Sequence, residues 1–138
     1  MQKEKFKAIN LIWELIVRID TNLENFPKKY IEIKNRIRNS TYDLLEIAYT
    51  ANTESNVDKK RDLIEIAIAK IKVIDFLINL SFDKKIITEK KYLKLGEAMD
   101  EIIKYLVGWK KSINKGMVDG VWAVVTLLFY HLACLALC

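Results

Sequence analysis

Apolar residues recur at helical spacing in four successive stretches of this chain. In the first stretch they follow one another at steps of three and four residues, which lines one face of a helix. The expected inward positions are Phe6, Ile9, Ile12, Ile16, Ile19 and Leu23; Tyr30, Ile33, Ile37, Leu44, Ile47 or Ala48, and Ala51; Ile64, Ala67, Ile68, Ile71, Ile74, Leu77 and Ile78; and Tyr92, Leu95, Met99, Ile102, Ile103 and Leu106. The pattern predicts an all-α fold.

Short polar or proline-containing segments separate the four predicted helices. Pro27 marks the first junction, because proline is tolerated in the first turn of a helix but not in its interior. Residues 50–56 are polar and aperiodic, and Ser55 opens a capping box with the acid three residues later. Thr88 is the predicted N-cap of the fourth helix, which we expect to end near Ser112. Since the connections are short, the helices should form an antiparallel up-down four-helix bundle.

Basic residues gather in two segments of this bundle, which we assign to residues 1–115. Residues 28–38 and residues 84–94 each contain five basic residues and one acid, a net charge of +4, whereas residues 39–58 contain four acids and no Lys or Arg. The basic residues are Lys28, Lys29, Lys34, Arg36, Arg38, Lys84, Lys85, Lys90, Lys91 and Lys94. An up-down bundle places both segments at one end. That end suits a nucleic-acid phosphate backbone, which gains affinity by counterion release without sequence reading.

The predicted bundle lacks the side chains that catalytic and metal sites need. It contains neither cysteine nor histidine, and its clustered acids Glu97, Asp100 and Glu101 therefore have no partner for acid–base chemistry. We interpret these acids as a solvated face, and we predict no enzyme activity, no metal and no cofactor. The lack of cysteine, together with a charged rather than apolar N-terminus, favours a reducing, cytoplasmic location.

The aromatic residues allow two interpretations. Tyr30 and Tyr92 fall within the basic segments, where they can stack on bases or pack in the core. Trp13 and Trp109 lie on helices with strong apolar stripes. Packing in the core or at a subunit interface is favoured for both tryptophans over the stacking of a ligand.

Several motifs in order along the chain carry a family resemblance. They are Asn25-Phe26-Pro27-Lys28-Lys29-Tyr30, Arg36-Ile37, Leu44-Leu45-Glu46, Ile87-Thr88 with Tyr92, and the run Glu101-Ile102-Ile103-Lys104-Tyr105-Leu106-Val107-Gly108-Trp109-Lys110-Lys111-Ser112. Over about residues 6–112 the chain resembles the accessory variability determinant (Avd) family of diversity-generating retroelements. It departs from that family at Ile103 and Val107, where members usually have glycine. The related bundle proteins of ribosomal RNA intervening sequences typically carry a Ser-Ile-Pro-Ser-like stretch that residues 39–46 lack, which favours the retroelement branch.

The resemblance implies a function for the chain. Members of the family form four-helix bundles that assemble into pentameric rings, bind RNA and/or DNA through a basic surface and associate with the retroelement reverse transcriptase during mutagenic copying of template RNA. We therefore expect these partners and a homopentamer, and we expect no membrane partner. The alternative is a structural four-helix-bundle protein of the ribosomal intervening-sequence type with no direct nucleic-acid role. A bundle tethered to a membrane by its tail is a third interpretation.

Residues 116–138 differ from the bundle in composition and form an apolar tail. The last eighteen residues, from Val121 to Cys138, carry no formal charge. The length of this uncharged stretch is at the lower limit for a membrane span of about 20 residues. His131, Cys134 and Cys138 stand three and four residues apart and can ligate zinc from one helix face. We interpret the tail as an appended segment that packs on the bundle or stays disordered, with a membrane anchor and a metal site as alternatives.

Overall fold

The computed structural model describes the backbone of residues 2–137 and the side chains of residues 6–113 and 125–136. Its elements are α1 (Gln2–Asn22), the 3-10 helix η1 (Lys28–Tyr30), α2 (Ile31–Thr53), α3 (Val57–Asp83) and α4 (Glu89–Leu137). No strand occurs over residues 2–137. The predicted all-α fold is therefore confirmed.

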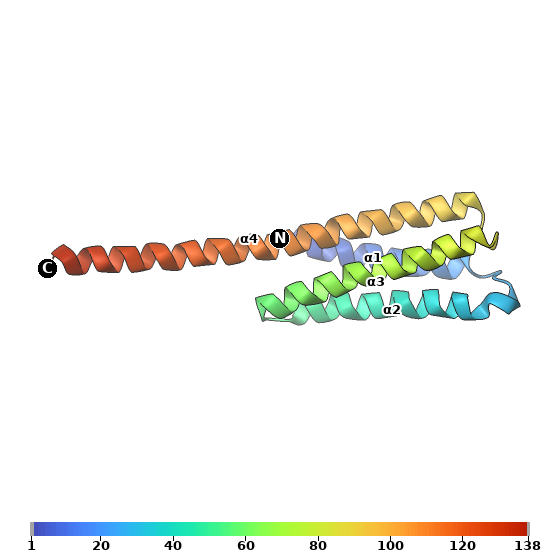
Figure 1. Ribbon diagram of the computed structural model, residues 1–138, viewed down its shortest axis with the longest axis horizontal. Coiled ribbons are helices and arrows are strands. Elements are labelled where there is room, and N and C mark those ends of the chain that lie inside the picture. The colour runs from blue at the N-terminus through green and yellow to red at the C-terminus, as the bar shows by residue number, and fades with distance from the viewer. Residues whose placement is uncertain (1, 138) are drawn as a thin grey trace.

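The four α-helices lie alongside one another in a bundle (Figure 1). Within the described part of the chain, α1 contacts α2, α2 contacts α3, α3 contacts α4 and α4 contacts α1, whereas α1 and α3 do not touch. Helices α1 and α3 therefore occupy opposite corners of the bundle. Figure 1 shows the connection from α1 to α2 and the turn from α3 to α4 at the same end.

The core follows the predicted apolar stripes. Among its fully buried side chains are Ile12, Leu15, Ile19, Leu23, Ile37, Leu44, Ile64, Ile71, Ile74, Ile78, Leu95 and Met99. Phe6 was predicted to face inward, but 52% of its surface is exposed. The reason is helical geometry: the core face of α1 runs through Ala8, Ile12 and Leu15, and a position two residues before Ala8 points roughly to the opposite side.

The caps of two helices show how local side chains set their starts. The Thr88 hydroxyl oxygen accepts a hydrogen bond from the Lys91 backbone N–H at 3.3 Å, as expected of an N-cap before α4. The predicted cap at Ser55 is wrong by one residue. Asn56 has an extended backbone, and its side-chain oxygen accepts from the Lys59 N–H at 3.0 Å, so α3 begins after Asn56.

A Schellman turn ends α3 at the basic end of the bundle. The Lys85 N–H donates to the Phe82 carbonyl and the Ile86 N–H donates to the Ser81 carbonyl, both at 2.9 Å. Lys85 has a φ of +60°, a left-handed conformation that glycine usually takes at this position. A lysine here carries a conformational cost of about 1 kcal/mol.

Helix α4 is longer than predicted. It was expected to end near Ser112, but it continues to Leu137 and projects well beyond the other helices (Figure 1). Residues 113–137 contain no proline, and their glycines lower helix propensity without breaking the hydrogen-bond ladder. The side chains of residues 125–136 are exposed, so in this structure they do not pack on the bundle. The division into a bundle and an appended tail at residue 116 stays a prediction.

The described residues bear on two alternatives for the tail, a membrane anchor and a zinc site. No helix among them is both long and apolar enough to cross a membrane. The described residues also contain no group of three His, Cys, Asp or Glu side chains able to hold a metal ion. Cys138, the third proposed zinc ligand, lies outside the described residues.

Candidate nucleic-acid interface

The two basic segments come together at Tyr30. The Lys29 ammonium lies 4.9 Å from the centroid of the Tyr30 ring, and the Lys84 ammonium lies 5.4 Å from the same centroid. The first lysine belongs to η1 and the second to the C-cap of α3, so residues far apart in the sequence share one tyrosine. Each ammonium interacts with the electron-rich face of the ring, an attraction worth about 0.5–1 kcal/mol at an exposed site.

Most of the ten predicted binding residues are available to a ligand. Seven of them are exposed, and the remaining three are half-buried. The exposed residues are Lys28, Lys29, Arg36, Lys84, Lys85, Lys90 and Lys94, and the half-buried ones are Lys34, Arg38 and Lys91. The exposed set contains members of both basic segments, which gives the end of the bundle several cations that can contact phosphates at once.

Two of the ten residues make polar contacts with α1. Arg38 Nε lies 3.1 Å from an Asp20 carboxylate oxygen, and the guanidinium also donates to the Tyr42 hydroxyl at 3.4 Å. The hydrogen bond to Tyr42, followed by the charge of Asp20, raises the pKa of Arg38, so its charge is permanent but partly neutralised. Lys91 Nζ lies 3.5 Å from the carbonyl oxygen of Asn22, the last residue of α1, where a cation complements the helix dipole.

Tyr92 is a packing residue rather than a free stacking surface. Its ring stacks on Phe82 with the centroids 4.5 Å apart and the planes inclined by 8°. Its hydroxyl donates a hydrogen bond to the Asn79 side-chain oxygen. These contacts tie α4 to α3 and support the core alternative for Tyr92. Tyr30 is half-buried, so part of its ring surface remains accessible.

The tryptophans have different environments. Trp109 is 2% exposed and packs in the core, which confirms one of the two packing modes expected for it. Trp13 is 53% exposed on α1, and its indole N–H donates to the Tyr49 hydroxyl at 3.0 Å. The indole therefore lies outside the core of the single chain.

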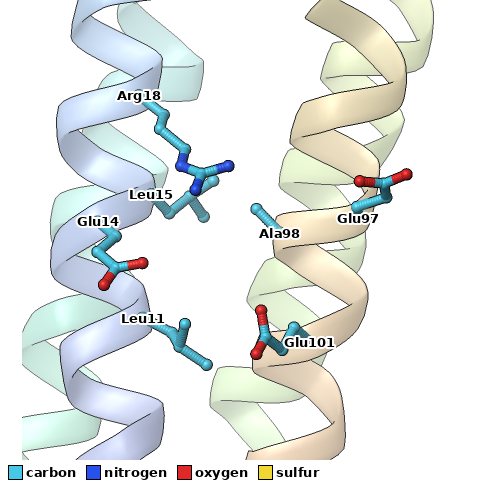
Figure 2. A pocket seen from close by; sticks show the side chains of 7 residues that line it. All are labelled: Leu11, Glu14, Leu15, Arg18, Glu97, Ala98 and Glu101. Atoms are coloured by element: carbon cyan, nitrogen blue, oxygen red, sulfur yellow. The ribbon is translucent and has the colours of Figure 1, made fainter.

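The acids considered for acid–base chemistry lie in two separate grooves. A groove between α4 and α1 is lined by Glu97 and Glu101 of α4 and by Glu14 and Arg18 of α1, with the Glu97 carboxylate pointing away from α1 (Figure 2). Asp100 lines a second groove, between α4 and α3, together with Asp75 and Tyr92, and Glu97 borders this groove as well. Burial, and then the negative charge of Asp100, raises the pKa of Asp75. Neither groove holds a histidine or cysteine among its lining residues.

Comparison with known proteins gives a family for this architecture. The sequence model of the bAvd-like family matches residues 6–113. The match includes both basic segments, the tyrosine that joins them and every buried apolar core residue described above. The comparison with curated proteins found no match.

Proposed function

Since this chain belongs to the bAvd-like family, we propose that it binds nucleic acid through the basic end of its bundle and associates with a retroelement reverse transcriptase. In this role it assists the mutagenic copying of template RNA. Family membership supports an accessory role in the context of a retroelement, and the family is generally non-catalytic. The proposal gives the chain no reaction of its own and no cofactor.

One observation carries the nucleic-acid part of the proposal: the ammonium groups of Lys29 and Lys84 both lie close to the Tyr30 ring. The contact places exposed cations from two distant segments on one surface. A phosphate backbone crossing that surface displaces counterions from several lysines at once, which yields affinity for many sequences alike. Arg38, through Asp20, and Lys91, through the Asn22 carbonyl, both attach this surface to α1, and only the charge of Arg38 is partly offset by an acid.

We further propose an antiparallel up-down bundle that assembles into a pentameric ring in a reducing, cytoplasmic location. The apolar side chains that remain exposed on α1 and α3, among them Trp13, Val17 and Phe76, support self-association. A monomer would leave these side chains in water, whereas contacts between copies can bury them. The absence of cysteine from residues 6–113 supports a reducing compartment.

The test has two parts. Fluorescence anisotropy of the full chain with labelled RNA and DNA of one length, over a series of salt concentrations, should show binding with a steep salt dependence and little sequence preference. We expect a reverse-transcriptase gene and an imperfect template repeat near the gene for this chain. The chain should co-purify with that reverse transcriptase. No binding even at low salt would remove nucleic acid from the proposal and favour the structural bundle protein instead.

A further inference from the structure

Helix α3 carries a second apolar stripe outside the core. Its buried stripe includes Ile64, Ala67, Ile71, Ile74 and Ile78. On the outer side Ile66, Ala69, Val73 and Phe76 follow one another at steps of three, four and three residues and are all exposed, Phe76 to 62%. Apolar residues at this spacing are typical of a helix face that packs against another helix. We call these four outer residues the α3 ridge.

Helix α1 offers a complementary hollow on its own outer side. Trp13, Glu14, Val17 and Arg18 line a shallow groove, in which Trp13 is 53% exposed and Val17 is 61% exposed. Four residues at these positions, one turn apart in pairs, form the kind of hole that receives a single side chain from a facing helix. Because the Trp13 indole N–H already donates to Tyr49, covering the indole would leave no unpaired donor. We call this feature the α1 groove.

The two features cannot meet within one molecule. Helices α1 and α3 occupy opposite corners of the bundle, since each contacts α2 and α4 and no contacts join α1 to α3 in the described part of the chain. We infer that the α3 ridge of one copy packs into the α1 groove of the next copy, with Phe76 seated among the four groove residues. This inference rests on the self-association proposed above and assigns its interface. Two different surfaces meet, so the contact is heterologous and its repetition closes into a ring or extends into a filament.

The flanking charges support this pairing. Glu14 lies on the side of α1 that faces α4, because it also lines the groove shown in Figure 2. On α3, Glu65 pairs with Lys110 of α4, and Asn79 accepts a hydrogen bond from Tyr92 of α4. Lys72 lies seven residues, or two helical turns, from each of them, so it lies on the same side of α3, which faces α4. A rotation about an axis parallel to the helices brings these two sides together, and Glu14 then faces Lys72.

Pairing of the α3 ridge with itself is electrostatically less favourable. Lys70 and Lys72 flank the ridge on its two sides. Lys70 is held towards α2 by Asp43 at 3.7 Å. A symmetric contact centred on Val73 would bring the lysines of one copy close to those of the other. Like charges at such a rim oppose association, whereas the corresponding side of the α1 groove carries the Glu14 carboxylate together with the Arg18 guanidinium one turn further along, and so has no net charge.

Two single substitutions on exposed positions test the interface in the full chain. Val17→Glu alters only the groove, and Phe76→Glu alters only the ridge. A carboxylate placed at the centre of an interface should raise the dissociation constant of self-association by about 30-fold or more. Sedimentation velocity should therefore show each variant as a monomer at concentrations where the unaltered chain is assembled. Leu93→Glu, at an exposed apolar position of α4 outside both features, is the matched control and should assemble normally.

Mixing the two variants gives the decisive result. A Val17→Glu copy keeps its ridge and a Phe76→Glu copy keeps its groove, so an equimolar mixture should form heterodimers of twice the chain mass and nothing larger. Assembly of either variant alone, with its circular dichroism unchanged, would overturn the inference. A mixture that stays monomeric would overturn it as well.

A charge exchange tests the orientation of the contact. Glu14→Lys or Lys72→Glu alone should weaken assembly by up to about fivefold, as rim ion pairs do, and the double variant should recover it. Failure of the double variant to recover would reject the parallel arrangement. If the unaltered chain is monomeric, both this interface and the proposed pentamer are rejected. Nucleic-acid binding is tested independently, by the anisotropy measurement.

Discussion

Removing four lysines from the basic end should weaken nucleic-acid binding in a way that identifies phosphate contacts. We consider Lys28, Lys29, Lys84 and Lys85 changed together to glutamine, because all four are exposed and lie at the η1 and α3–α4 junctions. For every phosphate that the variant no longer binds, the slope of log affinity against log salt should flatten by about 0.7 for single strands and 0.9 for duplexes. If all four lysines bind phosphates, the slope should change by about 3.

The same change has a structural cost that the contacts over Tyr30 make predictable. Lys29 and Lys84 each give up a cation–π interaction worth about 0.5–1 kcal/mol, so the variant should be less stable by about 1–2 kcal/mol. Thermal unfolding should show Tm lowered by a few degrees, with the helical content unchanged. The variant therefore remains folded under the conditions of the binding assay.

A matched variant at the other end of the bundle separates a local surface from general charge. The control variant loses the same positive charge at the opposite end, near the start of α1, the start of α3 and the point where α4 leaves the bundle. It carries glutamine in place of Lys7, Lys59, Lys60 and Lys111. Anisotropy titrations with one labelled RNA and one labelled DNA should show a clearly smaller change in slope for this control. Equally weakened binding by both variants would refute a binding surface at the basic end and would indicate diffuse attraction by the whole chain.

Three further outcomes concern stability. Lys85→Gly should raise the free energy of unfolding by up to about 1 kcal/mol, because glycine takes a φ of +60° without strain; an unchanged or lower Tm would contradict the Schellman assignment. Burial raises the pKa of Asp75 in the folded chain. The protonated Asp75 carboxyl therefore contributes fully to stability below its unfolded pKa of 3.8, and this contribution is lost as pH rises through the folded pKa. Asp75→Asn should therefore raise Tm at pH 7 but not at pH 3, and an equal effect at both pH values would exclude titration as the cause. Truncation after Lys115 should leave cooperative melting and helical content per residue intact, since the described tail side chains do not pack on the bundle; collapse to an unfolded chain would show that the tail completes the core.

The sequence by itself determined the helices and the family. Steps of three and four residues between apolar positions are a local property of an α-helix, so the stripes through Ile12, Ile37, Ile71 and Ile102 correctly predicted the buried face of each helix, although Phe6 of the first stripe is exposed. Thr88 was identified as a cap for the same reason, because an N-cap needs only its own hydroxyl and the next turn. The motifs from Asn25 to Ser112 also led to the family that the comparison found.

Tertiary structure decided which of the predicted binding residues are free. Composition counts Arg38 and Lys91 as equal to Lys28, yet the first pairs with Asp20 and the second binds the end of α1. Likewise Asp100 and Glu101 are adjacent in sequence, but Glu101 lines the groove towards α1 and Asp100 lines the groove towards α3, because α4 packs on α1 with one side and on α3 with another. Such assignments depend on the neighbouring helix, which no local pattern specifies.

The two faces of α3 show what packing adds to the sequence pattern. Ile64 and Ile66 each lie on a stripe at helical spacing, and the longer stripe, through Ile64, was the one predicted to face inward. Packing against α2 and α4 buries Ile64 completely and leaves Ile66 50% exposed. Local hydrophobicity favours burial of both residues, but a four-helix bundle has room in its core for only one face of each helix. The arrangement of the other three helices selects that face and leaves the second available for contact with another molecule.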